Sequence, residues 1–365
     1  MQVLETVTSL KLTFLSWYTD DNNTTTSNTV ETLKQNNDYY DVYIASSKQN
    51  SKQNTFNDMI RFDYNVLHYP VNDHINISCL AMKIFVGMCD LNKINIDERI
   101  LFNYIMRICD QYRANSYHNF HHAFCVLQFT ASLITNCGIK LSQIELFSIL
   151  VSALIHDVDH PGTNNDFQVK TSSVFAQSYK ESVLENHHIT VGLSAINSTD
   201  VNILEKWNNN DVELFQKIVR NSILATDMKL HGDMVNDLSS RCTNTYPFDL
   251  SNDEDRLFLA KHLIHASDIS NSVRPIHINS IISTYIAEEF NQQTVQEKDL
   301  GVAVTSWMML PDDVSKAKAE HNFLVHVGKP YYTLLAKCFP GYLNTLLDSL
   351  SLNIQHYQHI INATA

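Results

Sequence analysis

The strongest chemical signal in the sequence is the string HDVDH at residues 156–160, which closes a nearly continuous apolar run. Its two histidines and two aspartates offer nitrogen and oxygen donors of the kind that bind divalent metals. Burying unpaired carboxylates costs free energy, so such a string at the end of a buried helix favours a bound cation. The alternative is an ordinary helix end before a Pro-Gly turn, which would gain from a cationic histidine but not from aspartate.

Two further histidines, His118 and His122, lie four positions apart in YHNFHHAF. On a helix this spacing is about one turn, so both imidazoles can face the same point. The pair is weak evidence by itself, because 17 histidines in 365 residues produce such spacings by chance. Asp268 in LIHASDISN and Glu185 in LENHH are likewise more typical of ordinary helix ends when each is taken alone.

Taken together, one histidine, an adjacent His-Asp pair and a distant aspartate can hold a divalent cation with mixed nitrogen and oxygen donors. Such a set would combine one histidine of the His118 and His122 pair with His156, Asp157 and Asp268. The two carboxylate oxygens of Asp157 allow it to bridge two cations. A hydroxide shared by two such cations is a strong nucleophile at neutral pH, because the pKa of bound water falls to roughly 7.

The elements that must position these residues are predicted to be helices. Apolar residues at helical spacing dominate the chain from Phe62 onward, and the apolar run at 141–154 predicts a central, buried helix that ends at HDVDH. Strand alternation with hairpin turns is scarce. We therefore predict one all-α domain over residues 57–365, with about 14 to 16 helices.

Composition excludes several other classes of protein. The chain is 44% hydrophobic with eight glycines and seven prolines, which excludes collagen-like and wholly disordered proteins. A net charge of −13 argues against nucleic-acid binding. The seven cysteines lack paired short spacings and are typical of reduced thiols.

We expect a cytoplasmic enzyme for two reasons. No apolar run approaches the ~20 residues of a membrane span, which argues against membrane insertion. The N-terminus lacks the features of a signal peptide. Residues 1–56 are polar and low in complexity, and we expect them to form a flexible N-terminal segment.

The motif set resembles that of the class I 3′,5′-cyclic-nucleotide phosphodiesterases. YHNFHHAF, HDVDHPGTNN, LENHH, LATDM and HASDISN occur in that family's order, and the resemblance runs from about Phe62 to Tyr357. HNFHHAFCVLQ, DISNSVRP and AKCFPG are most similar to the cGMP-specific type-nine branch. The resemblance implies hydrolysis of a small-molecule cyclic nucleotide to the nucleoside 5′-monophosphate at a two-metal site at the base of a deep pocket. It also allows a homodimer.

The same resemblance implies a role for each matching residue. The tight ion, Zn²⁺, would be held by His122, His156, Asp157 and Asp268, and Asp157 would bridge to a second ion, Mg²⁺ or Mn²⁺. A bridging hydroxide would attack the cyclic phosphate while His118, as general acid, protonates the leaving O3′. The waters of the second ion would be oriented by an outer shell of His160, Glu185 and Thr226. The substrate would be bound by Tyr117, Asn271, Ile286, Phe290, Glu320 and Phe323.

One position of the purine pocket departs from the family pattern. Glu320 stands where the family has a glutamine, and Asn322 stands where it has a glycine. An ionised carboxylate only accepts hydrogen bonds; guanine presents two adjacent donors, N1–H and N2–H₂, whereas adenine presents one donor beside an acceptor. Keeping Glu320 protonated would cost on the order of 4 kcal/mol. We therefore predict a preference for cGMP over cAMP; a Glu320 that points to solvent is the alternative.

Two other functions stay open on the sequence alone. A non-catalytic cyclic-nucleotide-binding or decoy protein is suggested by the altered pocket at Glu320 and Asn322, although the complete ligand set and His118 count against it. Another metal phosphohydrolase of the HD superfamily is the second alternative, and YHNFHH and the C-terminal clamp region count against it.

Overall fold

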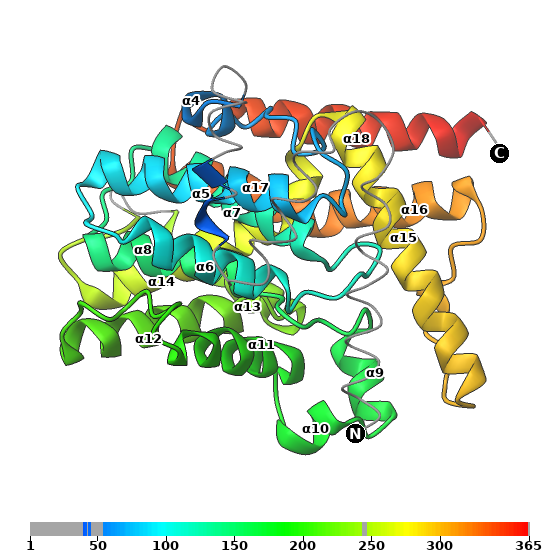
Figure 1. Ribbon diagram of the computed structural model, residues 1–365. Helices are drawn as coiled ribbons and strands as arrows, with labels where there is room; N and C mark the ends of the chain where they lie inside the picture. The colour runs from blue at the N-terminus through cyan, green and yellow to red at the C-terminus, as the bar shows by residue number, and fades with distance from the viewer. Residues whose placement is uncertain (1–38, 42, 45–53, 243–246, 364–365) are drawn as a thin grey trace, which may run out of the picture. The chain divides into compact units, whose positions relative to one another are not determined.

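The computed structural model describes residues 39–41, 43–44, 54–242 and 247–363, and the described residues contain helices but no β-strand (Figure 1). The fifteen α-helices that lie wholly within the described residues agree with the predicted number, and the all-α prediction is confirmed. All of these helices belong to the compact unit Ser51–Ala365. The N-terminal segment predicted over residues 1–56 lies almost entirely outside the described residues.

The helices follow one another along the whole of the unit. Their bounds are α4 (Phe56–Met59), α5 (His74–Asn92), α6 (Glu98–Cys109), α7 (Phe120–Asn136), α8 (Gln143–Ile155), α9 (Asn165–Lys170), α10 (Val174–Ser178), α11 (Val183–Ser194), α12 (Asn209–Leu224), α13 (His231–Arg241), α14 (Asp253–Asp268), α15 (Ile276–Asp299), α16 (Asp313–Phe323), α17 (Lys329–Cys338) and α18 (Asn344–Ala363). Short 3₁₀ segments are η2 (Ala195–Asn197), η3 (Met228–Leu230), η4 (Ile269–Val273) and η5 (Ser306–Met308), and η6 (Leu324–Gly328) is π-helical.

Helix α8 is the central element of the fold. A capping box starts it, in which Ser142 Oγ accepts from the Glu145 N–H and the Glu145 carboxylate accepts from the Ser142 N–H. Every residue from Glu145 to Ile155 is buried, as the apolar run predicted. The helix packs against α7, α12 and α14, and Figure 1 shows it between α5 and α12. Because α8 ends at Ile155, His156 and Asp157 lie inside the fold, directly after a buried helix.

Helix α5 is long and apolar enough to meet the length and composition criteria for a membrane span, although the sequence analysis expected no such segment. Ten of its nineteen residues are buried, and it packs against α6 and α7. A helix that buries its apolar face against neighbours in this way is a core helix of the unit.

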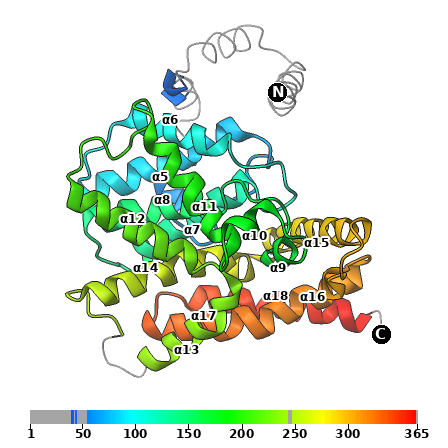
Figure 2. The same ribbon diagram turned by 90° about the horizontal axis from the view of Figure 1, so that it is seen from below.

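The C-terminal helices form the other side of the site. Helix α14 packs against α7, α8 and α12, and η4 leads from its end into the long helix α15. Helix α18 packs against α15, α16 and α17. Figure 2 shows α13, α16, α17 and α18 together on the side of the unit opposite α6. The end of α14 therefore lies where the helices before it in the chain meet the C-terminal helices that η4 contacts.

Candidate active site

The four predicted metal ligands converge from three helices. His122 lies in the first turn of α7, His156 and Asp157 follow α8, and Asp268 is the last residue of α14. The Nε2 atom of His122 lies 3.1 Å from Nε2 of His156 and 3.1 Å from Oδ1 of Asp268. The Nε2 atom of His156 lies 3.2 Å from Oδ2 of Asp157 and 3.3 Å from Oδ1 of Asp268. Residues separated by up to 146 positions in the chain thus share one site.

These separations fit a single bound cation. Two ligand atoms bound tetrahedrally at the usual zinc distances are about 3.3 Å apart, and the donor pairs in this cluster that include a histidine nitrogen are 3.1 to 3.4 Å apart. Two imidazole nitrogens with lone pairs repel each other at 3.1 Å unless a proton or cation lies between them. The Nδ1 atom of His156 lies 3.0 Å from the Ala153 carbonyl oxygen, so Nδ1 carries the proton and the Nε2 lone pair faces the cluster.

The electrostatics of the cluster also favour positive charge. Burial lowers the pKa of His156, but the carboxylates of Asp157 and Asp268 outweigh burial and raise this pKa well above its usual value. Burial acts in the opposite direction on Asp157, whose pKa is nevertheless held well below its usual value by His156 and His122. A cation placed among these donors would be stabilised by the same two carboxylates.

His118 is not on the same helix as His122, so the predicted one-turn relationship is wrong. Helix α7 begins at Phe120, and the side chain of its N-cap residue, Asn119, accepts hydrogen bonds from the N–H groups of His121 and His122. His118 therefore lies in the turn before the helix. Its ring centroid is still 5.7 Å from that of His122, close to the cluster.

Glu289, which the sequence analysis missed, holds His118 in place. One carboxylate oxygen, Oε2, accepts from the backbone N–H groups of Tyr117 (2.9 Å) and His118 (3.0 Å), and Oε1 contacts Nδ1 of His118. Burial lowers the pKa of His118, but the Glu289 charge and hydrogen bond outweigh it and raise this pKa to about 9. Burial likewise raises the pKa of Glu289, and His118 offsets that effect and lowers it to about 2. The pair favours a protonated imidazole, the form that a general acid needs.

A sequence signal for Glu289 did exist. Glu289 is 3% exposed and lies seven residues after the buried Ile282, which places both on one face of α15. Its neighbour Glu288 is exposed. An acidic residue on the buried face of a helix requires a partner, but the sequence alone does not identify that partner as His118.

The three residues predicted to form the outer shell make different kinds of contact. The ring of His160 stacks on that of His118, with centroids 4.1 Å apart. Glu185 lies in the first turn of α11, and both of its carboxylate oxygens accept from Nδ2 of Asn165 (3.2 and 2.9 Å). Burial and the nearby Asp227 raise the pKa of Glu185 to about 7. The Thr226 hydroxyl donates to the Ile223 carbonyl (2.8 Å), a bond within its own chain segment.

A cavity adjoins the metal-ligand cluster. Its lining includes the predicted ligands His122 and Asp268 together with Tyr117 and Asn271, two of the predicted substrate-binding residues. The Oδ1 atom of Asn271 is buried and has no hydrogen-bond partner. An unsatisfied amide oxygen beside the cluster can accept a hydrogen bond from a ligand.

The remaining predicted substrate-binding residues do not line this cavity. Ile286 and Phe290 are half-buried on α15, and the Phe290 ring packs edge-on against Trp307 with centroids 5.5 Å apart. Phe323 is half-buried at the end of α16. Glu320 lies on α16, one turn before Phe323, and is 7% exposed. The alternative in which Glu320 points to solvent is therefore wrong.

The Glu320 carboxylate is held by side chains that the sequence analysis did not identify. Its Oε1 accepts from Asn279 Nδ2 (2.9 Å) and its Oε2 accepts from the Ser283 hydroxyl (3.0 Å). The Tyr357 hydroxyl donates to Asn279 Oδ1 (2.7 Å), which fixes the orientation of that amide. Burial raises the pKa of Glu320, and the hydrogen bonds from Asn279 and Ser283 offset this rise only in part. A buried carboxylate with two fixed donors is an acceptor whose remaining lone pairs can bind a further N–H group.

Residues 117–350 match the family model described as 3′5′-cyclic nucleotide phosphodiesterase. The high affinity cGMP-specific 3′,5′-cyclic phosphodiesterase 9A of Mus musculus is 32% identical over 287 residues, which are 78% of this chain and 53% of that protein. The 3′,5′-cyclic-nucleotide phosphodiesterase regA of Dictyostelium discoideum is 33% identical over 301 residues, 81% of this chain and 37% of that protein. This chain thus spans about half, or less, of the length of these curated relatives.

Solved structures give the same assignment of the fold. The phosphodiesterase domain of the RhoPDE fusion protein from the choanoflagellate Salpingoeca rosetta is 28% identical and superposes with a TM-score of 0.79, covering 84% of this chain and 96% of that one. LmjPDEB1, solved in complex with IBMX, is 25% identical with a TM-score of 0.76, covering 84% and 93%. The resemblance seen in the sequence, including that to the type-nine branch, is confirmed.

Proposed function

Since the chain belongs to the 3′5′-cyclic nucleotide phosphodiesterase family, we propose that it hydrolyses a 3′,5′-cyclic nucleotide to the nucleoside 5′-monophosphate. One observation carries the proposal: the His118–Glu289 pair lies directly beside the cluster of His122, His156, Asp157 and Asp268. A decoy protein, which binds a nucleotide without reaction, would not need a proton donor beside such a cluster.

The four-residue cluster would hold a zinc ion, and Asp157 would also contact a second cation, Mg²⁺ or Mn²⁺. When bound, such cations neutralise phosphate charge and lower the pKa of water to the neutral range. The net charge of the chain is −13, so an anionic substrate is acceptable only where positive charge is concentrated. Cations bound by the donor cluster would supply this positive charge, and the carboxylates of Asp157 and Asp268 would hold them there.

His118 would supply the proton that the leaving O3′ requires. Its Nδ1 is occupied by Glu289, so Nε2 is the nitrogen that can present a proton to the substrate. Glu289 stays ionised because two backbone N–H groups and the imidazole stabilise its charge. The carboxylate thereby orients the ring and favours its cationic form, as a general acid requires.

We further propose that the substrate is cGMP in preference to cAMP. The support is Glu320, which is buried and accepts two hydrogen bonds from side chains that act against the rise of its pKa on burial. An ionised carboxylate in this position would gain from the adjacent N1–H and N2–H₂ donors of guanine and would face a lone pair of adenine. The mouse and Dictyostelium relatives named above are a cGMP-specific enzyme and a cyclic-nucleotide phosphodiesterase, respectively.

An activity assay with a substrate panel tests both proposals. The purified chain is incubated with Mg²⁺ or Mn²⁺ and with cGMP, cAMP or a set of deoxynucleoside triphosphates, and the 5′-products are separated chromatographically. We expect 5′-GMP from cGMP at a higher kcat/KM than 5′-AMP from cAMP. Tight cGMP binding without turnover would instead indicate a decoy, and turnover of the triphosphates alone would indicate another phosphohydrolase.

A further inference from the structure

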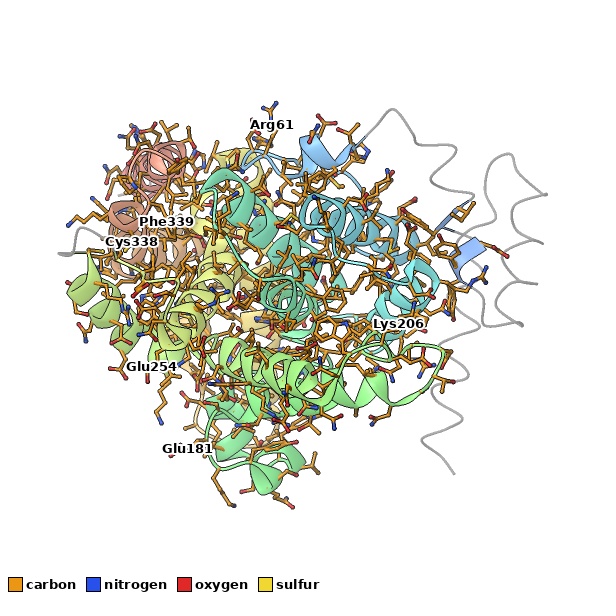
Figure 3. The ribbon with its side chains drawn as sticks, turned by 90° about the vertical axis from the view of Figure 1, so that its left-hand side faces the viewer. Arg61, Glu181, Lys206, Glu254, Cys338 and Phe339 are labelled. Carbon is orange, nitrogen blue, oxygen red and sulfur yellow. The ribbon has the colours of Figure 1, made fainter. Side chains whose placement is uncertain are left out.

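Two cysteines far apart in the chain meet where α13 and α17 pack together. Cys242 is the C-cap residue of α13, and Cys338 is the last residue of α17. Their Sγ atoms are 3.1 Å apart, although 96 positions separate the residues. Figure 3 shows Cys338, with Phe339 beside it, toward the edge of the unit in that view. The pair lies outside the catalytic machinery described above.

The local structure holds the two thiols together. The Cys242 thiol donates a hydrogen bond to the Leu334 carbonyl of α17 (3.1 Å), one turn before Cys338. Both cysteines are reduced, and a disulfide requires the sulfur atoms to approach to about 2.05 Å. Each cysteine is at a helix end, where a small backbone adjustment breaks fewer hydrogen bonds than it would inside a helix. The remaining movement is therefore about one ångström.

We propose that Cys242 and Cys338 form a thiol-oxidation site that closes a reversible disulfide between α13 and α17. The oxidant class is a peroxide. Cys242 is half-buried, whereas Cys338 is buried, so Cys242 meets the oxidant first. Burial and the Cys242 hydrogen bond raise the pKa of Cys338, which keeps it a protonated thiol until its partner has reacted.

The oxidation proceeds in two steps. The Cys242 thiolate attacks hydrogen peroxide, the O–O bond breaks, sulfur gains a hydroxyl group, and the released hydroxide takes up a proton to become water. The Cys338 sulfur then gives up its proton and attacks the Cys242 sulfur, so that the S–S bond forms and the S–O bond breaks. The leaving hydroxide becomes a second water. Two thiols are oxidised, and one peroxide is reduced to two waters.

The bond would join elements that support the active site. Tyr332 of α17 donates from its hydroxyl to the Ala266 carbonyl (2.5 Å), two residues before the metal ligand Asp268. A disulfide between Cys242 and Cys338 would close a long loop of chain and would restrict the unfolded ensemble more than the folded state. We therefore expect oxidation to raise the midpoint of thermal unfolding.

Peptide mapping tests the bond directly. Cys242 follows Arg241 and Cys338 follows Lys337, so trypsin places each cysteine at the start of a peptide, 242–256 and 338–365. The full chain is treated with hydrogen peroxide, alkylated and digested without reductant. We expect one linked species that is two hydrogen atoms lighter than the sum of the two free peptides and that dithiothreitol separates.

The controls make the outcome decisive. Cys242→Ser and Cys338→Ser should each abolish the linked species and the rise in the unfolding midpoint. Cys137→Ser is the matched control, because Cys137 is also a helix C-cap with a right-handed backbone, and it should retain both. Oxygen addition to either cysteine without linkage, or linkage to another cysteine, would overturn the proposal. The wild-type peptide map decides the question even if a variant fails to fold, and none of these measurements depends on turnover.

Discussion

The Nδ1 atom of His118 contacts Oε1 of Glu289, a residue 171 positions later in the chain. The same carboxylate accepts from the backbone N–H groups of Tyr117 and His118, so α15 fixes both the ring and the turn that carries it. His118, in the turn before α7, is thereby held beside the predicted metal ligands on α7, after α8 and on α14. The general acid proposed here depends on a positioning residue that belongs to none of the predicted motifs.

Glu289→Gln is expected to reduce kcat by about 10- to 100-fold, because an amide neither holds the imidazole as firmly nor favours its protonated form. KM should change less than kcat, and the pH at which kcat declines on the alkaline side should fall. Steady-state kinetics across pH measure both effects. Glu288→Gln is the matched control, an exposed glutamate on the same helix. Equal losses in the two variants would contradict the role of Glu289.

His156→Ala is expected to lose the tightly bound metal, because one of four donors at about 3 Å spacing is removed. Metal content per chain, measured by mass spectrometry of the purified protein, checks this. His118→Ala should keep its metal while losing activity by about 10²- to 10⁴-fold, the usual contribution of a general acid. Metal loss in His118→Ala would make that residue a ligand.

Glu320→Gln is expected to lower the ratio of kcat/KM for cGMP to that for cAMP by about tenfold, the value of one hydrogen bond to a charged group. An amide offers a donor and an acceptor, so it suits both purines. Parallel assays of the two nucleotides measure the ratio, and Glu288→Gln serves again as the exposed control. An unchanged ratio in Glu320→Gln would remove the basis of the cGMP preference.

His262 makes stability depend on pH outside the active site. Its ring is 1% exposed, Nδ1 lies 2.9 Å from the Tyr331 hydroxyl, and burial followed by repulsion from His265 lowers its pKa to about 3. Between about pH 3 and the unperturbed value near 6.5 the unfolded chain binds a proton that the folded chain excludes. The free energy of unfolding should therefore fall as pH drops below 6.5, by up to about 1.4 kcal/mol per pH unit for this one group.

Denaturant titrations of His262→Gln at pH 7, 6 and 5 check this contribution. The slope of unfolding free energy against pH should be shallower in the variant, by an amount that corresponds to the uptake of up to one proton on unfolding. This expectation does not depend on the stability of the variant at pH 7. The exposed residue His277 provides the control, since His277→Gln should keep the wild-type slope. A parallel slope in His262→Gln would show that His262 does not exclude a proton on folding.

Local pattern was sufficient to predict the helical class and a dense group of metal-binding donors at residues 156–160. The apolar run at 141–154 predicts a helix that other helices surround on all sides. Polar residues that directly follow such a helix must lie inside the fold. The HDVDH string contains four donors in five residues, so it indicates a metal site without knowledge of which residues pack against it. His122 and Asp268 became interpretable only as members of an ordered motif set.

Tertiary structure decided how His118 and Glu320 are held. The spacing of His118 and His122 suggested one helical turn, but Asn119 caps α7 and leaves His118 outside it. Glu289, Asn279 and Tyr357 reach their partners across 171, 41 and 78 positions. Sequence periodicity reports which face of a helix is buried, not which helix covers that face. The sequence by itself therefore determined which groups are proposed to react, and only the packing of α15, α16 and α18 determined how these groups are oriented and which hydrogen-bond partners they have.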